Sequence, residues 1–140
     1  MTLELALRLA GALQIALAAI HVVFPKRFDW KEELTRLSLL NRQMFLVHTV
    51  FICVVLVLVG SLSLLAPHTL LEPTPLSRLV LGGIAAFWGL RLVVQLFVYD
   101  TRLWHGNRFN TLVHVVFCVL WAYLVAVYAG AFLLQAGALH

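Results

Sequence analysis

Charge is scarce in this sequence. Only 11% of its 140 residues are charged, whereas 63% are hydrophobic and the mean hydropathy is +0.99. Such a composition lies well outside the range of soluble globular domains and predicts a protein in contact with a lipid bilayer. The net charge of +4 and the pI near 9.6 come from basic residues that border apolar stretches. They therefore give no reason to expect a nucleic-acid partner.

Acidic residues and cysteines are also few. The chain has 6 acidic residues, and the only two in or beside the long apolar stretches, Glu4 and Asp100, lie at the ends of those stretches. The 2 cysteines, Cys53 and Cys118, both fall inside apolar stretches. This pattern excludes a secreted disulfide framework and a Cys-x-x-Cys redox motif, while a disulfide between the two stays open.

Four apolar stretches are long enough to cross a membrane, since each supplies about the 20 residues that a bilayer core requires. They run from Leu3 to Phe24, from Gln43 to Leu65, from Leu76 to Tyr99 and from Phe109 to Leu134. Leucines and charged residues alternate over residues 28–40, which predicts a short amphipathic helix at the interface. We therefore predict an all-α, polytopic membrane protein with a single integral-membrane domain over residues 1–140.

Basic residues are distributed unevenly between the connections. The first and third connections hold Lys26, Arg27, Lys31, Arg36, Arg42, Arg102 and Arg108, whereas the opposite side has only Arg8 and Arg78. By the positive-inside rule, the first and third connections are cytoplasmic and both termini face outwards. The expected location is the cell membrane, in particular a bacterial inner membrane.

An internal repeat surrounds two of the histidines. Residues 42–51 and 108–117 share an arginine, the tripeptide Leu-Val-His, a valine and a phenylalanine at matching positions. The repeat extends to the preceding helices, because His21 precedes Trp30 by nine residues, as Gln95 precedes Trp104. We predict an up-down bundle of four transmembrane helices, built from two tandem hairpins, residues 3–65 and 76–134, with pseudo-twofold symmetry about the membrane normal.

The repeat also places four polar side chains at a similar depth. His48 and His114 each lie six residues past their boundary arginine, or about 9 Å into the membrane at the rise of an α-helix. His21 and Gln95 lie four and five residues before Pro25 and Asp100, which follow the predicted spans, or about 6 to 7 Å deep. Ionisable groups inside a membrane are costly and mark function by default, so this layer is the candidate site.

The first interpretation of this layer is a transition-metal centre near the cytoplasmic face, ligated by His21, His48 and His114. Neutral imidazole suits iron, copper or zinc, and three histidines with an open position form a familiar catalytic arrangement. Redox or oxygen chemistry on a lipophilic or small substrate would follow, although the sequence does not decide whether the protein is an enzyme. The residues that could complete the ligand shell or orient the ligands are Gln95, Asp100, Asn41, Asn110 and Cys118.

Two further interpretations stay open. A b-type haem could be held by His48 and His114 as opposite axial ligands from diagonal helices. Alternatively, the histidines could only form hydrogen bonds between helices. The protein would then be a non-catalytic accessory or structural subunit of a membrane complex, facing other membrane subunits or a second copy of itself.

Arg91 lies about eight residues from the end of its span, too deep to be ignored. No acidic residue of the same span is placed to neutralise it, since Asp100 falls on roughly the opposite helix face. A buried arginine without a counter-ion predicts an anion. We therefore interpret Arg91 as the group that binds a carboxylate-bearing substrate, a lipid headgroup or a haem propionate.

Overall fold

The computed structural model describes residues 2–100, 102 and 108–137, and every regular element in these ranges is helical. The four long helices are α1 (Leu3–Ile20), α4 (Leu39–Leu65), α6 (Pro75–Phe97) and α7 (Arg108–Gly137). All 4 are long and apolar enough to cross a membrane, by length and composition. The predicted all-helical fold with four long apolar helices is confirmed.

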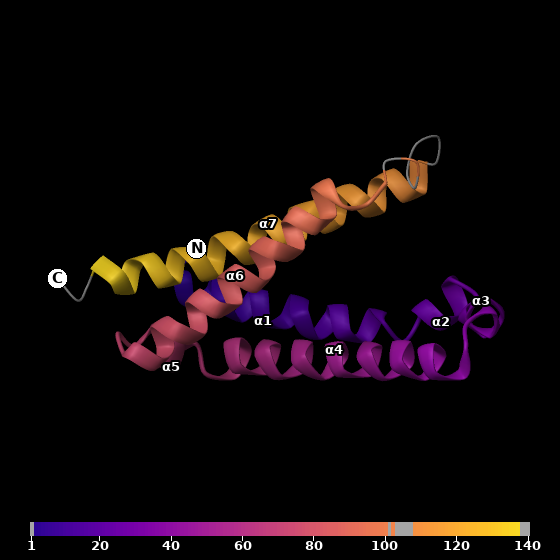
Figure 1. Cartoon of the computed structure of the whole chain (residues 1–140). Coiled ribbons are helices and arrows are strands. Elements are labelled where there is room, and N and C mark those ends of the chain that lie inside the picture. The colour runs from indigo at the N-terminus through magenta and orange to yellow at the C-terminus, as the bar shows by residue number, and fades with distance from the viewer. Residues whose placement is uncertain (1, 101, 103–107, 138–140) are drawn as a thin grey trace. The chain divides into compact units, whose positions relative to one another are not determined.

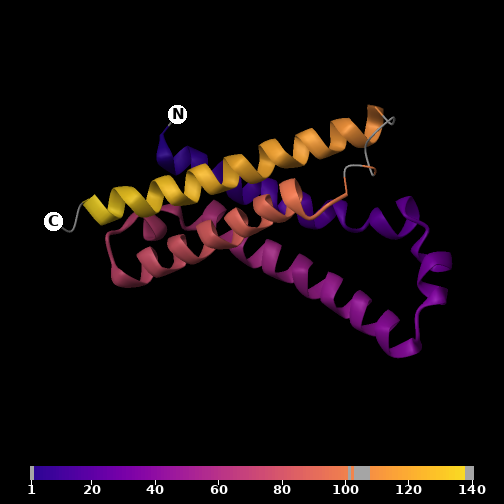
Figure 2. The same cartoon turned by 45° about the horizontal axis from the view of Figure 1, so that its top comes forward.

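The chain forms two compact units, each of which contains a helical hairpin (Figure 1). One unit is Arg8–Pro67 and contains the hairpin of α1 and α4. The other combines residues 1–7 with 68–140 and contains the hairpin of α6 and α7. Figure 2 shows α6 and α7 again side by side and antiparallel, from another direction.

Two glycines bring the backbones of α1 and α4 close together. A Cβ atom added to Gly11 would lie 2.5 Å from the carbonyl oxygen of Gly60, and one added to Gly60 would lie 2.8 Å from the carbonyl oxygen of Gly11. Beside this contact, Arg8 donates a hydrogen bond of 2.8 Å to the carbonyl oxygen of Leu64. Small residues allow such backbone contacts between membrane helices, so this crossing fixes how the first hairpin packs.

The second hairpin is fastened at the end where α6 begins. Thr74 caps α6 through a reciprocal capping box with Ser77. The buried side chain of Gln135 on α7 donates hydrogen bonds of 2.6 Å to the carbonyl oxygen of Leu70 and 3.0 Å to that of Glu72. These bonds give partners to two backbone oxygens that lie outside the long helices. An unpaired polar group buried in an apolar environment would cost free energy, so the bonds stabilise this end of the hairpin.

The first connection differs from the single amphipathic helix predicted over residues 28–40. It contains α2 (Phe24–Arg27), α3 (Trp30–Glu33) and a 3-10 turn, η1 (Leu34–Arg36). Asp29 separates α2 from α3 because its backbone is left-handed, with a φ of 46°. That part of the prediction is wrong.

Several helix boundaries also differ from those of the predicted spans, and α4 begins at Leu39 rather than Gln43. The first span ends at Ile20 rather than Phe24, so His21 lies in a turn. A short helix, α5 (Pro67–Leu71), occupies the second connection. Trp104, the counterpart of Trp30 in the repeat, lies outside the described residues.

Candidate functional site

The polar side chains of the second hairpin meet at Gln95, which is 6% exposed on α6. Its side-chain oxygen accepts hydrogen bonds from the guanidinium of Arg91 at 3.2 Å and from the indole N–H of Trp121 at 3.4 Å. Both partners can only donate, so they fix which end of the amide is the oxygen. The amide nitrogen of Gln95 then faces Nδ1 of His114 at 2.8 Å.

This chain of donors determines the tautomer of His114. An amide nitrogen can only donate, so Nδ1 of His114 must be the acceptor and the proton of the neutral ring lies on Nε2. Nε2 lies 3.6 Å from the sulfur of Cys118, one helical turn further along α7. Both ring nitrogens of His114 are therefore engaged within what we call the α6–α7 cluster: Arg91, Gln95, His114, Cys118 and Trp121.

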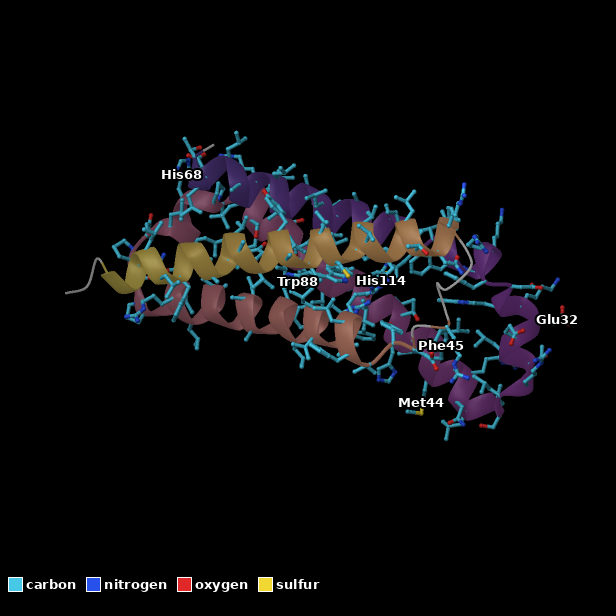
Figure 3. The ribbon with its side chains drawn as sticks, turned by 90° about the horizontal axis from the view of Figure 1, so that it is seen from above. Glu32, Met44, Phe45, His68, Trp88 and His114 are labelled. Carbon is cyan, nitrogen blue, oxygen red and sulfur yellow. The ribbon has the colours of Figure 1, made fainter. Side chains whose placement is uncertain are left out.

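Aromatic rings surround this cluster. Trp121 is stacked on Trp88, with ring centroids 4.9 Å apart, and on Phe117, with centroids 5.4 Å apart. Figure 3 shows Trp88 and His114 between the ribbons of α6 and α7. Trp88 is only 2% exposed, and its indole N–H has no hydrogen-bond acceptor among the described residues. An unpaired donor of this kind is uncommon and calls for an explanation.

Arg91 lies across two aromatic faces. Its guanidinium carbon is 4.9 Å from the ring centroid of Trp121 and 5.6 Å from that of Tyr99, both within the range of cation–π attraction. In the part of the chain that the structure describes, no Asp or Glu forms an ion pair with Arg91. The side chain follows Gln95 and Tyr99 towards the Phe97 end of α6, the end predicted to be cytoplasmic.

Asp100, predicted to complete the ligand shell or to orient the ligands, forms an ion pair with Arg102. Its carboxylate accepts a hydrogen bond of 2.8 Å from the backbone N–H of Arg102 and side-chain bonds of 2.9 and 2.6 Å from the guanidinium. These bonds, first the side-chain ones and then the backbone one, hold the pKa of Asp100 below its ordinary value. The backbone bond, in which the side chain accepts from the N–H two residues later, is typical of an aspartate that begins a turn.

His21 and His48 have the opposite tautomer to His114. Nδ1 of His21 lies 2.8 Å from the carbonyl oxygen of Leu17, and Nδ1 of His48 lies 2.7 Å from that of Met44. A carbonyl can only accept, so Nδ1 carries the proton and Nε2 keeps its lone pair in the neutral ring. Metal-binding histidines are typically held in this way, with the second nitrogen bonded to a backbone carbonyl.

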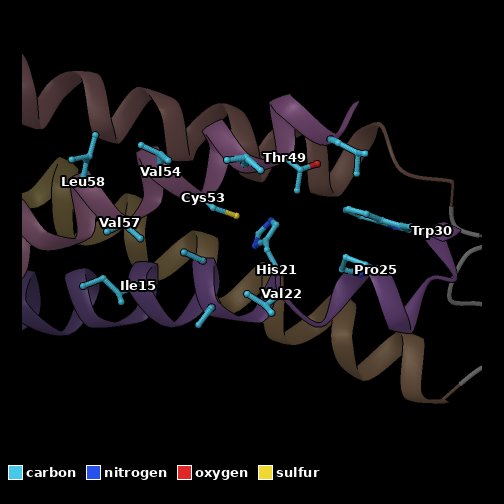
Figure 4. Close-up of a pocket in the computed structure, with 14 residues that line it drawn as sticks. Ile15, His21, Val22, Pro25, Trp30, Thr49, Cys53, Val54, Val57 and Leu58 are labelled. Atoms are coloured by element: carbon cyan, nitrogen blue, oxygen red, sulfur yellow. The ribbon is translucent and has the colours of Figure 1, made fainter. Parts of the chain in front are cut away.

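His21 lines an open groove of about 690 Å³ in the first hairpin, which we call the α1–α4 groove (Figure 4). His48 is exposed and is not one of the lining residues. The lining positions on α4 recur every three or four residues, which defines one helix face, and His48 falls on the other side. The structure therefore does not bring His21 and His48 together, although it brings their repeat counterparts, Gln95 and His114, into contact.

The remaining predicted residues lie near the start of the helices that carry the histidines. The backbone N–H of Asn41 donates to the Ser38 side chain that caps α4, and Asn110 is half-buried in the first turn of α7. The described residues contain no cluster of three or more His, Cys, Asp or Glu side chains arranged to hold a metal. Since His21 and His48 belong to one unit and His114 to the other, the three-histidine centre stays a prediction.

Sequence reasoning missed Trp88, whose ring stacks on Trp121 of the α6–α7 cluster. Trp88 precedes Gln95 by seven residues, which places both on one face of α6 after two turns. That spacing was the available signal for Trp88. The α1–α4 groove had no comparable signal, because its lining is almost entirely aliphatic.

No protein-family model, curated protein or solved structure matches this chain. Its function must therefore be argued from the residues themselves.

Proposed function

We propose that this protein is an integral membrane protein that binds a lipophilic anion at the α6–α7 cluster. The observation that carries the proposal is Arg91, a guanidinium within a predicted span that rests on Trp121 and Tyr99 and has no acidic partner among the described residues. A charge in hydrocarbon is expensive and is normally paired. A carboxylate or phosphate from a ligand would supply the missing negative charge.

The surroundings of Arg91 suit an amphiphile with its acidic group towards the membrane surface. Only one of the guanidinium nitrogens bonds to Gln95, and an arginine offers five N–H donors, enough to bind a carboxylate or phosphate as well. One turn deeper on α6, the indole N–H of Trp88 is fully buried, so it could donate to a carbonyl or ester oxygen of the same ligand only after the packing around it opens. The rings of Trp121 and Phe117 would contact its apolar part.

Tryptophan fluorescence provides the test, because Trp121 lies directly against Arg91. The full chain in phosphatidylcholine nanodiscs would be titrated with dibromostearate, whose bromines quench tryptophan on contact, and with its uncharged methyl ester. We expect saturable quenching by the acid and only weak, non-saturable quenching by the ester. Arg91→Gln should weaken binding of the acid at least about tenfold, since it removes a charge-assisted bond.

The matched control is Arg78→Gln. Arg78 also lies on α6 and also stacks on a ring, with its guanidinium carbon 5.7 Å from the centroid of Phe132, but it is far from the cluster in sequence. Binding should be unchanged in this variant and partly retained in Arg91→Lys. Equal quenching by the acid in all variants would refute the proposal. Competition by phosphatidylglycerol, but not by a soluble carboxylate, would identify the ligand as a lipid headgroup.

A transition-metal centre is the second candidate, and the tautomers of His21 and His48 favour it. Both rings are held through Nδ1, which leaves Nε2 available for iron, copper or zinc. We propose His21, His48 and His114 as its ligands, with redox or oxygen chemistry as its use. Such a centre requires two changes from the arrangement described above. His48 would have to turn towards His21, which lines the groove that His48 does not face, and His114 would have to give up its contact with either Gln95 or Cys118.

Metal analysis and an absorption spectrum of the purified protein separate the remaining alternatives. Near-stoichiometric metal that is lost in a His48→Ala, His114→Ala double variant would support the metal centre. A Soret band lost in the same variant would instead support haem b. If neither metal nor a Soret band is found after reconstitution, the anion site and an accessory role without a cofactor are the functions that remain.

A further inference from the structure

The α1–α4 groove is a second site of different chemistry from the α6–α7 cluster. Its side chains come from the end of α1, the first connection and the middle of α4. Polar atoms are few: those of His21, Trp30, Thr49 and Cys53. Figure 4 shows His21 projecting into the space between the two helices, with the sulfur of Cys53 directed towards it. We propose that this groove binds a neutral lipid that carries a hydroxyl group, and that the hydroxyl donates to Nε2 of His21.

The hydrogen-bonding capacity of the groove determines this ligand class. His21 uses Nδ1 to donate to Leu17, so Nε2 can only accept. Thr49 donates its hydroxyl proton to the carbonyl oxygen of Phe45 at 2.9 Å, so its oxygen can also only accept. The thiol of Cys53 is a weak donor at best. The indole N–H of Trp30 is the strong donor of the lining. A hydroxyl group can donate to His21 and accept from Trp30, whereas an ester or ether can only accept and leaves Nε2 of His21 without a donor.

Charge and size agree with a neutral amphiphile. No Lys, Arg, Asp or Glu lines the groove, so nothing there would stabilise an ionic headgroup. The volume of about 690 Å³ falls within the range of small-molecule sites. From Thr49 the lining continues along α4 to Leu58, nine residues or about 13 Å deeper. An alkyl or prenyl chain would fit along this aliphatic stretch, with its hydroxyl beside His21 and Trp30 near the membrane surface.

Photo-crosslinking in nanodiscs tests the site with a defined probe. The full chain, first treated with EDTA so that no metal occupies His21, would be irradiated with a diazirine-bearing octadecanol, and the crosslinked peptides mapped. Unlabelled octadecanol and its methyl ether would then compete. We expect crosslinks within residues 15–30 and 46–58, the two stretches that line the groove. We also expect competition by the alcohol at concentrations about two- to tenfold lower than by the ether, the effect of one hydrogen bond.

His48→Leu is the matched control for His21→Leu. Both histidines bond to a carbonyl four residues earlier, but only His21 lines the groove. His21→Leu should remove the preference for the alcohol over the ether, and His48→Leu should keep it. If His21→Leu does not fold, Thr49→Val should reduce the preference instead. Equal competition by alcohol and ether in the native protein, or crosslinks confined to other segments because another part of the chain covers the groove, would overturn the proposal.

The result is independent of the anion site. Stearate should compete poorly for the groove, and Arg91→Gln should leave the octadecanol crosslinks unchanged. Loss of anion binding with retained alcohol binding, or the reverse, would therefore count against only one of the two sites.

Discussion

At the scale of single residues, the side chain of Gln95 links Arg91, Trp121 and His114 through hydrogen bonds. Its oxygen accepts from two donors that cannot accept, Arg91 and Trp121, and its nitrogen donates to a histidine that must then accept. One amide therefore orients a cation, an indole and an imidazole at once. The same bonds hold Arg91 beside Trp121, where we propose that an anion binds.

Replacing Gln95 with leucine should destabilise the protein by about 1 to 2 kcal/mol, because Trp121 and His114 lose their partner in an apolar setting. Unfolding in mixed micelles of increasing SDS content, followed by circular dichroism, would measure the change. Gln43→Leu is the control, since Gln43 is exposed at the start of α4 and should change stability by less than about 0.5 kcal/mol. A Gln95→Leu variant as stable as this control would show that the bonds contribute nothing net.

The sequence was informative about single residues where helical spacing alone determines how far along its helix a residue lies. It singled out Arg91 by depth and placed Gln95 and His114 in one layer, and these three residues share a cluster. It could not foresee that His21 and His48 would fail to meet. The repeat makes them counterparts of Gln95 and His114, but α1 ends at Ile20 and His48 faces away from the groove. Rotation about a helix axis depends on tertiary packing, which a local repeat does not encode.

At the scale of helices, the contact between Gly11 and Gly60 determines the first hairpin. Each glycine lies where a methyl group would meet the backbone of the other helix, which cannot move aside as a flexible side chain can. Gly83, on α6, has nothing within 4 Å of the corresponding position. Identical glycines therefore have different roles, and the sequence did not distinguish them because neither lies in a recognisable motif.

Gly11→Ala should destabilise the protein by about 1 to 3 kcal/mol, as overpacking does. Gly83→Ala should instead be neutral or stabilise it by up to about 1 kcal/mol, since alanine favours the helix and meets no clash. The measurement is SDS-induced unfolding of the full chain for both variants. A stabilised Gly11→Ala protein would contradict the close crossing of α1 and α4.

At the scale of the whole molecule, four helices in the described part of the chain are long and apolar enough to span a bilayer. Their number and approximate ends were predictable because about 20 apolar residues are needed for each crossing. The broken first connection was not, since its left-handed residue, Asp29, carries no distinctive local pattern. Orientation rests on the distribution of lysine and arginine, and we propose that both termini face outwards.

Cysteine labelling in bacterial cells would test this orientation in a Cys53→Ala, Cys118→Ala background. Lys31→Cys, in the first connection, should react with a membrane-impermeant maleimide only after permeabilisation. Pro73→Cys, in the second connection, should react in intact cells. The reverse pattern would place Arg91 near the outer surface and would invert the proposed topology.

The most direct measurement of the central claim is native mass spectrometry of the full chain extracted from membranes in a mild detergent. We predict a bound acidic lipid or lipophilic carboxylate on the native protein and on Arg78→Gln, and its loss or depletion by at least about tenfold in Arg91→Gln, where the charge-assisted bond is gone. The same bound species at the same occupancy in all three proteins would contradict the assignment of Arg91 as an anion-binding residue.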